Sequence, residues 1–340
     1  NADDGKYTFT ATSGGDNLFP EGQGNGFITV SVPAPSGMTD NQVFVYYLGP
    51  NGAEKIDAAV KGEDNSKTVT WTVDHFSTYF VTTTEQSVSV TVDGTTTTYT
   101  NFSDAMKNIS EEAESVVVNL LSNVTVTETV EMDSDVTLNL NGFSVNGEES
   151  GPDPLFKVTD GKLSVAGKGT IVAGKGDAFQ VIGETAVANL SSTTQKPAVE
   201  IGSDVTVTAV NNCVYIKGKD AQADIYGSLT STGIYAVIQG NGTKDETTDN
   251  GGTIVNIYDG ASVIHAGADG QAHIAIYQPQ SGELNIYGGT ISATQDGSTA
   301  IEIRAGELNI SGDAVITGGS GTPDSDTNRS EEHTSELQSL

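Results

Sequence analysis

Residues 282–293 read GELNIYGGTISA, and residues 306–318 read GELNISGDAVITG. Both segments begin with Gly-Glu-Leu-Asn-Ile, in which apolar and polar residues alternate, and both reach a second apolar run after a Gly-containing corner. Alternation with a period of two is typical of a β-strand with one buried face. A repeated strand-corner-strand unit predicts that successive copies stack, because one copy cannot bury its own apolar face.

Looser copies of this unit precede the pair. They are DVTLNLNGFSV from Asp135, GKLSVAGKGTIVA from Gly161, AVEIGSDVTVTA from Ala198, ADIYGSLTST from Ala223 and TIVNIYDGASVIHA from Thr253. A further short apolar run follows each copy, so a coil holds about three strands. The pattern predicts a parallel β-solenoid with coils of about 24 residues, in which every second side chain points into a common core.

Two outward rows follow from this alternation. The centre of the first strand in each coil supplies Asn139, Ser164, Glu200, Asp224, Asn256, Asn285 and Asn309. A later strand supplies Thr159, Ile182, Lys217, Gln239, Tyr277 and Arg304. The second row is mixed, and it suggests no particular chemistry.

Residues 1–83 have a different organisation. Residues 27–32, 43–48 and 68–73 alternate apolar and polar side chains, and turn-forming segments separate them. Short strands at this spacing predict an all-β sandwich.

Residues 84–114 join the sandwich to the solenoid, which we expect over residues 115–320. Asp93-Gly94 predicts a hairpin turn. Phe102 and Met106 lie on one face of a short predicted helix. A single amphipathic helix ahead of a repeat array is typical of a cap that covers the apolar end of the first coil.

Residues 321–340 depart from the repeat. Their last part, RSEEHTSELQSL at residues 329–340, resembles the translation of a common short-read sequencing adapter. We therefore expect residues 321–340 to be a disordered tail, and we expect any C-terminal anchor to lie outside this sequence.

Two segments resemble known families. From residue 88 to about residue 318 the chain resembles the pectate-lyase-like right-handed parallel β-helices of bacterial surface and adhesin proteins, with LNLNG at residues 138–142 where these proteins commonly carry LDLNG. TVDHFSTYFV at residues 72–81 resembles the last strands of Ig-like surface-protein modules. The resemblance implies an Ig-like β-sandwich followed by a capped right-handed parallel β-helix. It implies little about activity, because this fold hosts lyases, hydrolases and adhesins alike.

Charge limits the classes of partner. The chain of 340 residues has 45 acidic and 15 basic side chains and a formal charge of −30. This charge repels phosphate backbones and anionic membranes, so we expect no nucleic-acid partner. The single cysteine excludes an internal disulfide, and no apolar run approaches the roughly 18 residues of a membrane span. We expect an extracellular monomer without a cofactor, attached to the bacterial surface and not inserted in the membrane.

A lyase site is not predicted. Calcium-dependent pectate lyases need clustered carboxylates and an Arg or Lys base. Residues 71–75, WTVDH, superficially match the WiDH motif of that family, but they precede the solenoid. Arg304 is the only arginine before the tail.

A hydrolase or metal site is not predicted either. Glu200 and Asp224 fall on equivalent outward positions of neighbouring coils, but the Asp-Asp, Gly-His-Gly and Arg-x-Lys steps of polygalacturonases are missing from the solenoid. We interpret both as solvated surface carboxylates. His265 and His273 lack a third ligand and are interpreted as isolated surface histidines, and Cys213 as an inert thiol at an outward or corner position.

One aromatic row suggests binding. Tyr226, Tyr258 and Tyr287 follow the first strand in three consecutive coils, and alternation places them outward, about 4.8 Å apart. Polar groups form the row beside them: Asp224, Asn256 and Asn285. Aromatic faces beside amides and carboxylates suit sugar rings, which predicts a glycan platform. The alternative is an aromatic ladder that only stabilises stacking.

These patterns together predict a non-catalytic bacterial cell-surface protein, a stalk or adhesin with weak glycan binding along the solenoid. Its expected partners are host or environmental glycans or surface proteins. The alternative is a carbohydrate-active enzyme, a polysaccharide lyase or glycoside hydrolase, of the pectate-lyase-like superfamily. An enzyme requires a cleft walled by long inserted loops, whereas a stalk requires smooth outer sheets.

Overall fold

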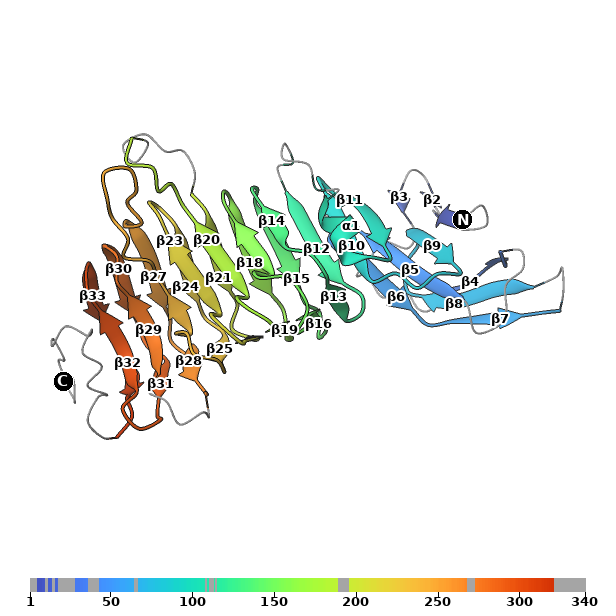
Figure 1. The fold of residues 1–340 in the computed structure, drawn as a ribbon. Helices are drawn as coiled ribbons and strands as arrows, with labels where there is room; N and C mark the ends of the chain where they lie inside the picture. The colour runs from blue at the N-terminus through green and yellow to red at the C-terminus, as the bar shows by residue number, and fades with distance from the viewer. Residues whose placement is uncertain are drawn as a thin grey trace.

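The structure is a computed structural model. It describes residues 5–9, 12–13, 16–17, 28–35, 43–63, 67–107, 109, 113, 115–188, 196–267 and 273–320. In this part of the chain, antiparallel sheets form a small N-terminal unit, and a long stack of parallel sheets follows (Figure 1). The predicted all-β class and parallel solenoid are confirmed. The tail predicted at residues 321–340 lies outside the described residues.

The N-terminal unit consists of two antiparallel sheets that share one core. Their strand orders are β1-β9-β5-β6 and β4-β8-β7. Alternate residues of both sheets, including Val45 and Trp71, are buried between them. The strands are β1 (Gly5–Thr8), β4 (Ile28–Pro33), β5 (Phe44–Gly49), β6 (Gly52–Ile56), β7 (Ala58–Lys61), β8 (Thr68–Val73) and β9 (Thr78–Thr82), with a separate pair β2 (Thr12–Ser13) and β3 (Asp16–Asn17).

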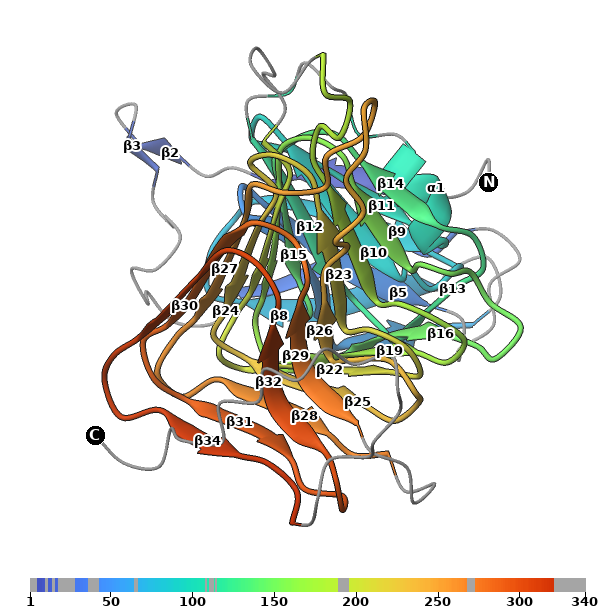
Figure 2. The ribbon, with the colours of Figure 1, turned by 60° about the vertical axis from the view of Figure 1, so that its left-hand side comes forward.

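The solenoid has three long sheets, which Figure 2 shows as the sides of one tube. Their strands pair in parallel, except for the hairpin β10–β11, which extends the first sheet in the antiparallel sense. The ten-stranded sheet contains β11 (Thr95–Tyr99), β10 (Val88–Val92), β12 (Val116–Leu120), β15 (Val136–Asn139), β18 (Lys162–Ala166), β21 (Ala198–Ile201), β24 (Gln222–Ile225), β27 (Thr253–Ile257), β30 (Gly282–Ile286) and β33 (Glu307–Ile310).

The other two sheets repeat the same order along the chain. The eight-stranded sheet contains β13 (Val124–Val126), β16 (Ser144–Gly147), β19 (Gly169–Ala173), β22 (Val205–Ala209), β25 (Ser228–Ser231), β28 (Ser262–His265), β31 (Thr290–Ala293) and β34 (Val315–Thr317). The seven-stranded sheet contains β14 (Val130–Met132), β17 (Phe156–Val158), β20 (Phe179–Ile182), β23 (Val214–Lys217), β26 (Ile238–Gln239), β29 (Ile274–Gln278) and β32 (Thr299–Ile303).

Like side chains stack on like inside the tube. Phe156 and Phe179 are rung mates with ring centroids 5.3 Å apart. Alternation in the first strand of each coil predicts an inward row from Leu138 to Ile310, and its members from Leu138 to Ile286 are buried. The prediction is wrong for Ile310, which is 39% exposed, and for Leu308, which is only partly buried, because no described coil stacks over them.

The coils differ in length. Rung mates in the row that starts at Asp224 are 32, 29 and 24 residues apart in sequence. The insertion between β26 and β27 accounts for the longest step, and it pairs with the loop after β20 through Ala186 and Thr248. At the LNLNG corner, Asn141 and Gly142 have φ values of 50° and 88°. This left-handed turn suits Asn and Gly, because other side chains crowd the backbone there.

A short helix and the hairpin close the first coil. Asp93 and Gly94 form the predicted turn between β10 and β11 with positive φ angles. The helix α1 (Phe102–Lys107) begins where Asn101 Oδ1 accepts the N–H of Asp104 at 3.1 Å. Phe102 is buried against Phe156, edge to face, in the solenoid core. The predicted cap helix is therefore present.

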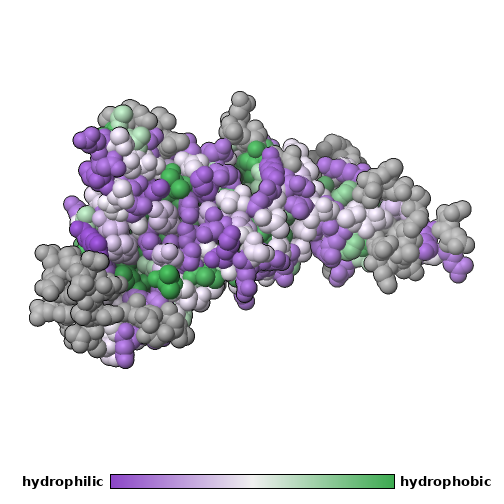
Figure 3. Space-filling view, in the orientation of Figure 1, coloured by the Kyte–Doolittle hydropathy of each residue, from purple (hydrophilic) through white to green (hydrophobic). Residues whose placement is uncertain are grey.

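The N-terminal unit is joined to the solenoid by buried contacts. Tyr46, Ala53 and Leu121 form a small apolar cluster between the two parts. The Tyr46 hydroxyl accepts the N–H of Gln86 at 2.8 Å, and Asn119 Nδ2 donates to the carbonyl of Asn51 at 2.9 Å. The molecule is accordingly one elongated body (Figure 1), and outside the grey residues the face drawn in Figure 3 is mainly purple and white, with a few green hydrophobic patches.

The register corrects both predicted outward rows. Ser164 pairs with Thr137, whereas Asn139 pairs with Ala166, so the row that contains Ser164 continues through Thr137 and not through Asn139. In the seven-stranded sheet, Tyr215, Gln239, Tyr277 and Glu302 form one row. Ile182 and Lys217 belong to a different row of that sheet. Both errors are slips of two residues, which keep each side chain on the correct face and change only its neighbour.

Candidate functional site

The predicted tyrosines form a continuous stack at the corner that follows β24, β27 and β30 of the ten-stranded sheet. The rings of Tyr226 and Tyr258 have centroids 4.1 Å apart and planes 5° apart. Those of Tyr258 and Tyr287 are 5.3 Å and 28° apart. The stacking that alternation predicted is confirmed.

Both faces of Tyr258 are covered by its neighbours in this stack. Tyr258 is half-buried, whereas Tyr287 is 45% exposed. Burial raises the pKa of the Tyr258 hydroxyl, and the hydrogen bond with Tyr226 and the charge of Asp224 raise it further. A sugar ring that approaches from solvent meets the edge of Tyr258 and not its face.

The polar row beside the tyrosines is a buried hydrogen-bond ladder. Asn256 Nδ2 donates to Asp224 Oδ1 at 2.7 Å, and Asn285 Nδ2 donates to Asn256 Oδ1 at 3.0 Å. Asn309 Nδ2 continues the ladder to Asn285 Oδ1 at 2.9 Å. Asp224, Asn256 and Asn285 are all buried. The groups expected to bind glycan hydroxyls are therefore bonded to one another, and a glycan platform at these six residues stays a prediction.

The two carboxylates considered for hydrolysis are rung mates, as predicted. Glu200 pairs with Asp224 across β21 and β24, and Lys162 Nζ lies 2.5 Å from Glu200 Oε2. Burial alone lowers the pKa of Lys162, but its hydrogen bond to Glu200 and the nearby carboxylate charges raise it overall. The expectation that Asp224 is solvated is wrong, because the amide ladder covers it. Both carboxylates already have polar partners, which supports interpreting them as structural residues.

The histidines and the cysteine are not at the surface. His265 and His273 are buried, with stacked rings 4.1 Å apart. His265 Nδ1 accepts the N–H of Gly267, so its Nε2 donates to the carbonyl of Tyr235 at 3.0 Å. Cys213 lies in the core, where burial raises the pKa of its thiol. The surface positions predicted for the two histidines are wrong, because His265 is the inward-facing last residue of β28 and His273, directly before β29, is also buried. Cys213 lies at the corner before β23, one of the two positions predicted for it, but its side chain is in the core.

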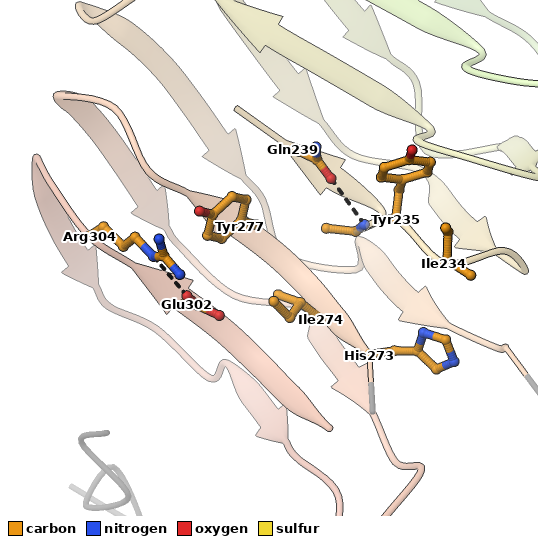
Figure 4. Close-up of a pocket in the computed structure, with 9 residues that line it drawn as sticks. Ile234, Tyr235, Gln239, His273, Ile274, Tyr277, Glu302 and Arg304 are labelled. Carbon is orange, nitrogen blue, oxygen red and sulfur yellow. Dashed lines mark hydrogen bonds and ion pairs between the residues drawn. The ribbon is translucent and has the colours of Figure 1, made fainter. Parts of the chain in front are cut away.

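The seven-stranded sheet carries a pocket that the sequence did not indicate. Its volume is about 230 Å³, and its lining comes from β26, β29, β32, the segment before β26, the residue before β29 and the residue after β32. In Figure 4, Ile234 and Tyr235 lie on one side, Tyr277 and Arg304 on the other, and Ile274 between them. The remaining lining residues are Ala236, Gln239, His273 and Glu302.

Polar groups in the pocket have fixed orientations. Arg304 Nε donates to Glu302 Oε1 at 3.0 Å, and the guanidinium lies 5.3 Å from the centroid of the Tyr277 ring. Gln239 Oε1 accepts the N–H of Ala236 at 3.4 Å. The pocket therefore combines apolar walls with an amide and an ion pair. Alternation in the sequence places Gln239, Tyr277 and Arg304 on one row but indicates no chemistry there, because it does not bring Tyr235 and Glu302 beside them.

The two remaining candidates from the sequence, the WTVDH segment and a metal centre, do not form a site in the described part of the chain. Asp74 and His75 of the WTVDH segment lie after β8 in the N-terminal unit, and the hydrogen bond from His75 lowers the pKa of Asp74. Over residues 5–320, apart from the gaps in the described chain, no three His, Cys, Asp or Glu side chains are grouped to hold a metal ion. In the same residues, no helix is long and apolar enough to cross a bilayer.

No protein-family model, curated protein or solved structure matches this chain.

Proposed function

We propose that this protein is a non-catalytic, extracellular stalk or adhesin of a bacterial surface, which binds glycans weakly along its solenoid. The proposal takes the solenoid as a right-handed, pectate-lyase-like β-helix and the N-terminal unit as an Ig-like module. The basis of both assignments is the sequence resemblance at residues 72–81 and 138–142.

The observation that carries the proposal is the interlocked outer surface of the ten-stranded sheet. Its central row is bonded rung to rung from Asp224 to Asn309, and the tyrosine row beside it is stacked. Side chains that bond along the axis stiffen the stack, because bending the tube strains every rung. A stiff, hydrophilic rod suits a protein that holds a binding surface away from a cell.

Charge and loops favour the same proposal. The formal charge of −30 keeps such a rod soluble and separated from anionic surfaces. The two inserted loops at residues 184–187 and 243–249 pair with each other. Neither contributes to the lining of the pocket on the seven-stranded sheet. An enzyme of this class needs loops that wall a cleft over its reacting groups.

The test compares binding with turnover for the purified full chain. A glycan array should show weak binding that increases with oligosaccharide length, and the bound glycans should be recovered intact by mass spectrometry. The matched variants are Glu200→Gln and Asp224→Asn, which remove the paired carboxylates. Product formation by the parent protein that is lost in either variant contradicts the proposal and supports a glycoside hydrolase.

A further inference from the structure

We propose that the pocket between β26, β29 and β32 binds a single neutral sugar ring of pyranose size. This inference rests on the proposed function, because it assigns the glycan binding of the rod to a specific place. The place differs from the tyrosine row of the ten-stranded sheet, whose central ring has no uncovered face.

The size of the pocket favours one ring. Its volume of about 230 Å³ is below the roughly 300–1,000 Å³ of pockets for drug-sized ligands. Ile234 and Tyr235 on one side and Tyr277 on the other provide apolar walls around Ile274 (Figure 4). A pyranose presents apolar C–H faces and polar edges, and such walls complement its faces.

The exposure of the wall formed by residues 234 and 235 also indicates a ligand. Ile234 is 70% exposed and Tyr235 is 44% exposed, so two large apolar side chains that are adjacent in the chain both face solvent. A large aliphatic and an aromatic side chain exposed together at a pocket rim suggest a surface that a ligand covers. The carbonyl of Tyr235 is held by His265 Nε2 at 3.0 Å, which anchors this corner to the buried histidine pair.

The polar groups complement hydroxyls. Sugar hydroxyls both donate and accept hydrogen bonds. Glu302 offers carboxylate oxygens, and Arg304 uses only its Nε toward Glu302, so its terminal nitrogens remain as donors. Gln239 Oε1 accepts hydrogen bonds from the N–H of Ala236 and from Asn212 Nδ2. The amide nitrogen of Gln239 can therefore donate to a sugar hydroxyl.

The charge balance favours a neutral ligand. Arg304 lies 3.0 Å from Glu302, so the two charges of the pocket offset each other. The carboxylate of an acidic sugar would find no unpaired cation in the pocket. The formal charge of −30 on the whole chain would also repel it. The geometry therefore selects hexoses and N-acetylhexosamines over uronic and sialic acids.

Saturation-transfer difference NMR of the purified full chain tests the proposal. The probes are methyl glycosides of glucose, galactose, mannose and N-acetylglucosamine, with glucuronic acid as the acidic comparison. At least one neutral glycoside should bind, and glucuronic acid should not. Tyr235→Ala and Tyr277→Ala should each weaken binding by roughly five- to tenfold, the range expected for one aromatic contact.

Ile310→Ala is the control, because Ile310 is 39% exposed and lies outside both the pocket and the tyrosine row. The control should bind the glycoside like the parent, and circular dichroism should show that every variant keeps the parent's melting temperature. Unchanged binding in both pocket variants overturns the inference, as does binding of glucuronic acid alone.

A further variant, Tyr287→Ala in the tyrosine row, separates this inference from the proposed function. If Tyr287→Ala weakens binding to longer glycans and the pocket variants do not, the adhesin proposal stands and the pocket is not the site. If no glycan binds, whatever its length or charge, both fail.

Discussion

One position of the repeat shows how a single residue type stabilises the rod. Asn256, Asn285 and Asn309 each donate an amide hydrogen to the rung before, and Asp224 accepts the first of these bonds. An asparagine suits this position because its amide both donates and accepts, so identical residues can bond indefinitely along the axis. A carboxylate can only accept when ionised, so it suits the start of the ladder and no other rung.

An Asn256→Asp variant should therefore be destabilised in a pH-dependent manner. It places a second buried carboxylate against Asp224, and both burial and like charge raise the pKa of the pair in the folded protein. Since the folded state then binds a proton more tightly than the unfolded state, the free energy of unfolding falls as pH rises through the raised pKa. We expect a loss of roughly 2 kcal/mol or more at pH 7 that largely disappears near pH 4.

Urea unfolding at both pH values, relative to the parent at each, measures this effect. Asn309→Asp is the control, because Asn309 lies at the exposed end of the same ladder. An equal loss at pH 4 and pH 7 in Asn256→Asp contradicts the role assigned to the ladder.

At the scale of the element, the strand register determines which side chains reach the core. Ile257 in β27 pairs with Ile225 before it and Ile286 after it, and all three are fully buried. The corners are where coils differ, since insertions there lengthen a coil without changing the register of its strands. Strand pairing along the stack therefore tolerates variation that is confined to the corners.

Ile257→Asp tests the register, and Ile234→Asp is its matched control. Residue 257 is buried in the middle of the stack, whereas residue 234 is 70% exposed. The core variant loses apolar burial and introduces an unpaired charge, so we expect a loss of roughly 3–5 kcal/mol. The control should change stability by less than about 0.5 kcal/mol. Thermal melting of both proteins gives the answer, and equal melting temperatures mean that the register is misassigned.

At the scale of the whole molecule, the N-terminal unit and the solenoid form one elongated body (Figure 1). Their junction buries Tyr46 completely, and this burial raises the pKa of its hydroxyl to about 12. The hydroxyl accepts the N–H of Gln86 at 2.8 Å, and Ser89 Oγ accepts the N–H of Ala53 at 3.1 Å. Buried backbone groups that are satisfied across a junction oppose its opening, because separation leaves them to be hydrated again.

Small-angle X-ray scattering of Ala53→Lys and Glu54→Lys tests whether this junction is rigid. The two residues are adjacent in β6, but Ala53 is buried in the junction and Glu54 is exposed. A lysine at residue 53 should weaken the junction by roughly 2 kcal/mol or more and broaden the distance distribution. The lysine at residue 54 should leave the distribution unchanged. If both variants scatter like the parent, the cluster of Tyr46, Ala53 and Leu121 does not hold the two units together.

The sequence alone was sufficient to predict the solenoid, its inward residues as far as Ile286, the cap helix and the tyrosine stack. All of these follow from local alternation and from repeats, which depend on a side-chain period of two and on like residues recurring once per coil. The hairpin at Asp93-Gly94 was equally local, because both residues tolerate the positive φ angles that the turn needs.

Only the tertiary structure decided which residues become neighbours across coils. Coil length varies with corner insertions, so spacing in sequence did not reveal that Tyr277 lies beside Glu302, or that Tyr235 faces both across a pocket. The burial of His273 and Cys213, which lie directly before a strand, had no periodic signal, whereas His265 ends β28 at a position where the alternation of that strand already points to the core. The physical reason is that alternation determines on which face a side chain lies, whereas stacking determines what it contacts.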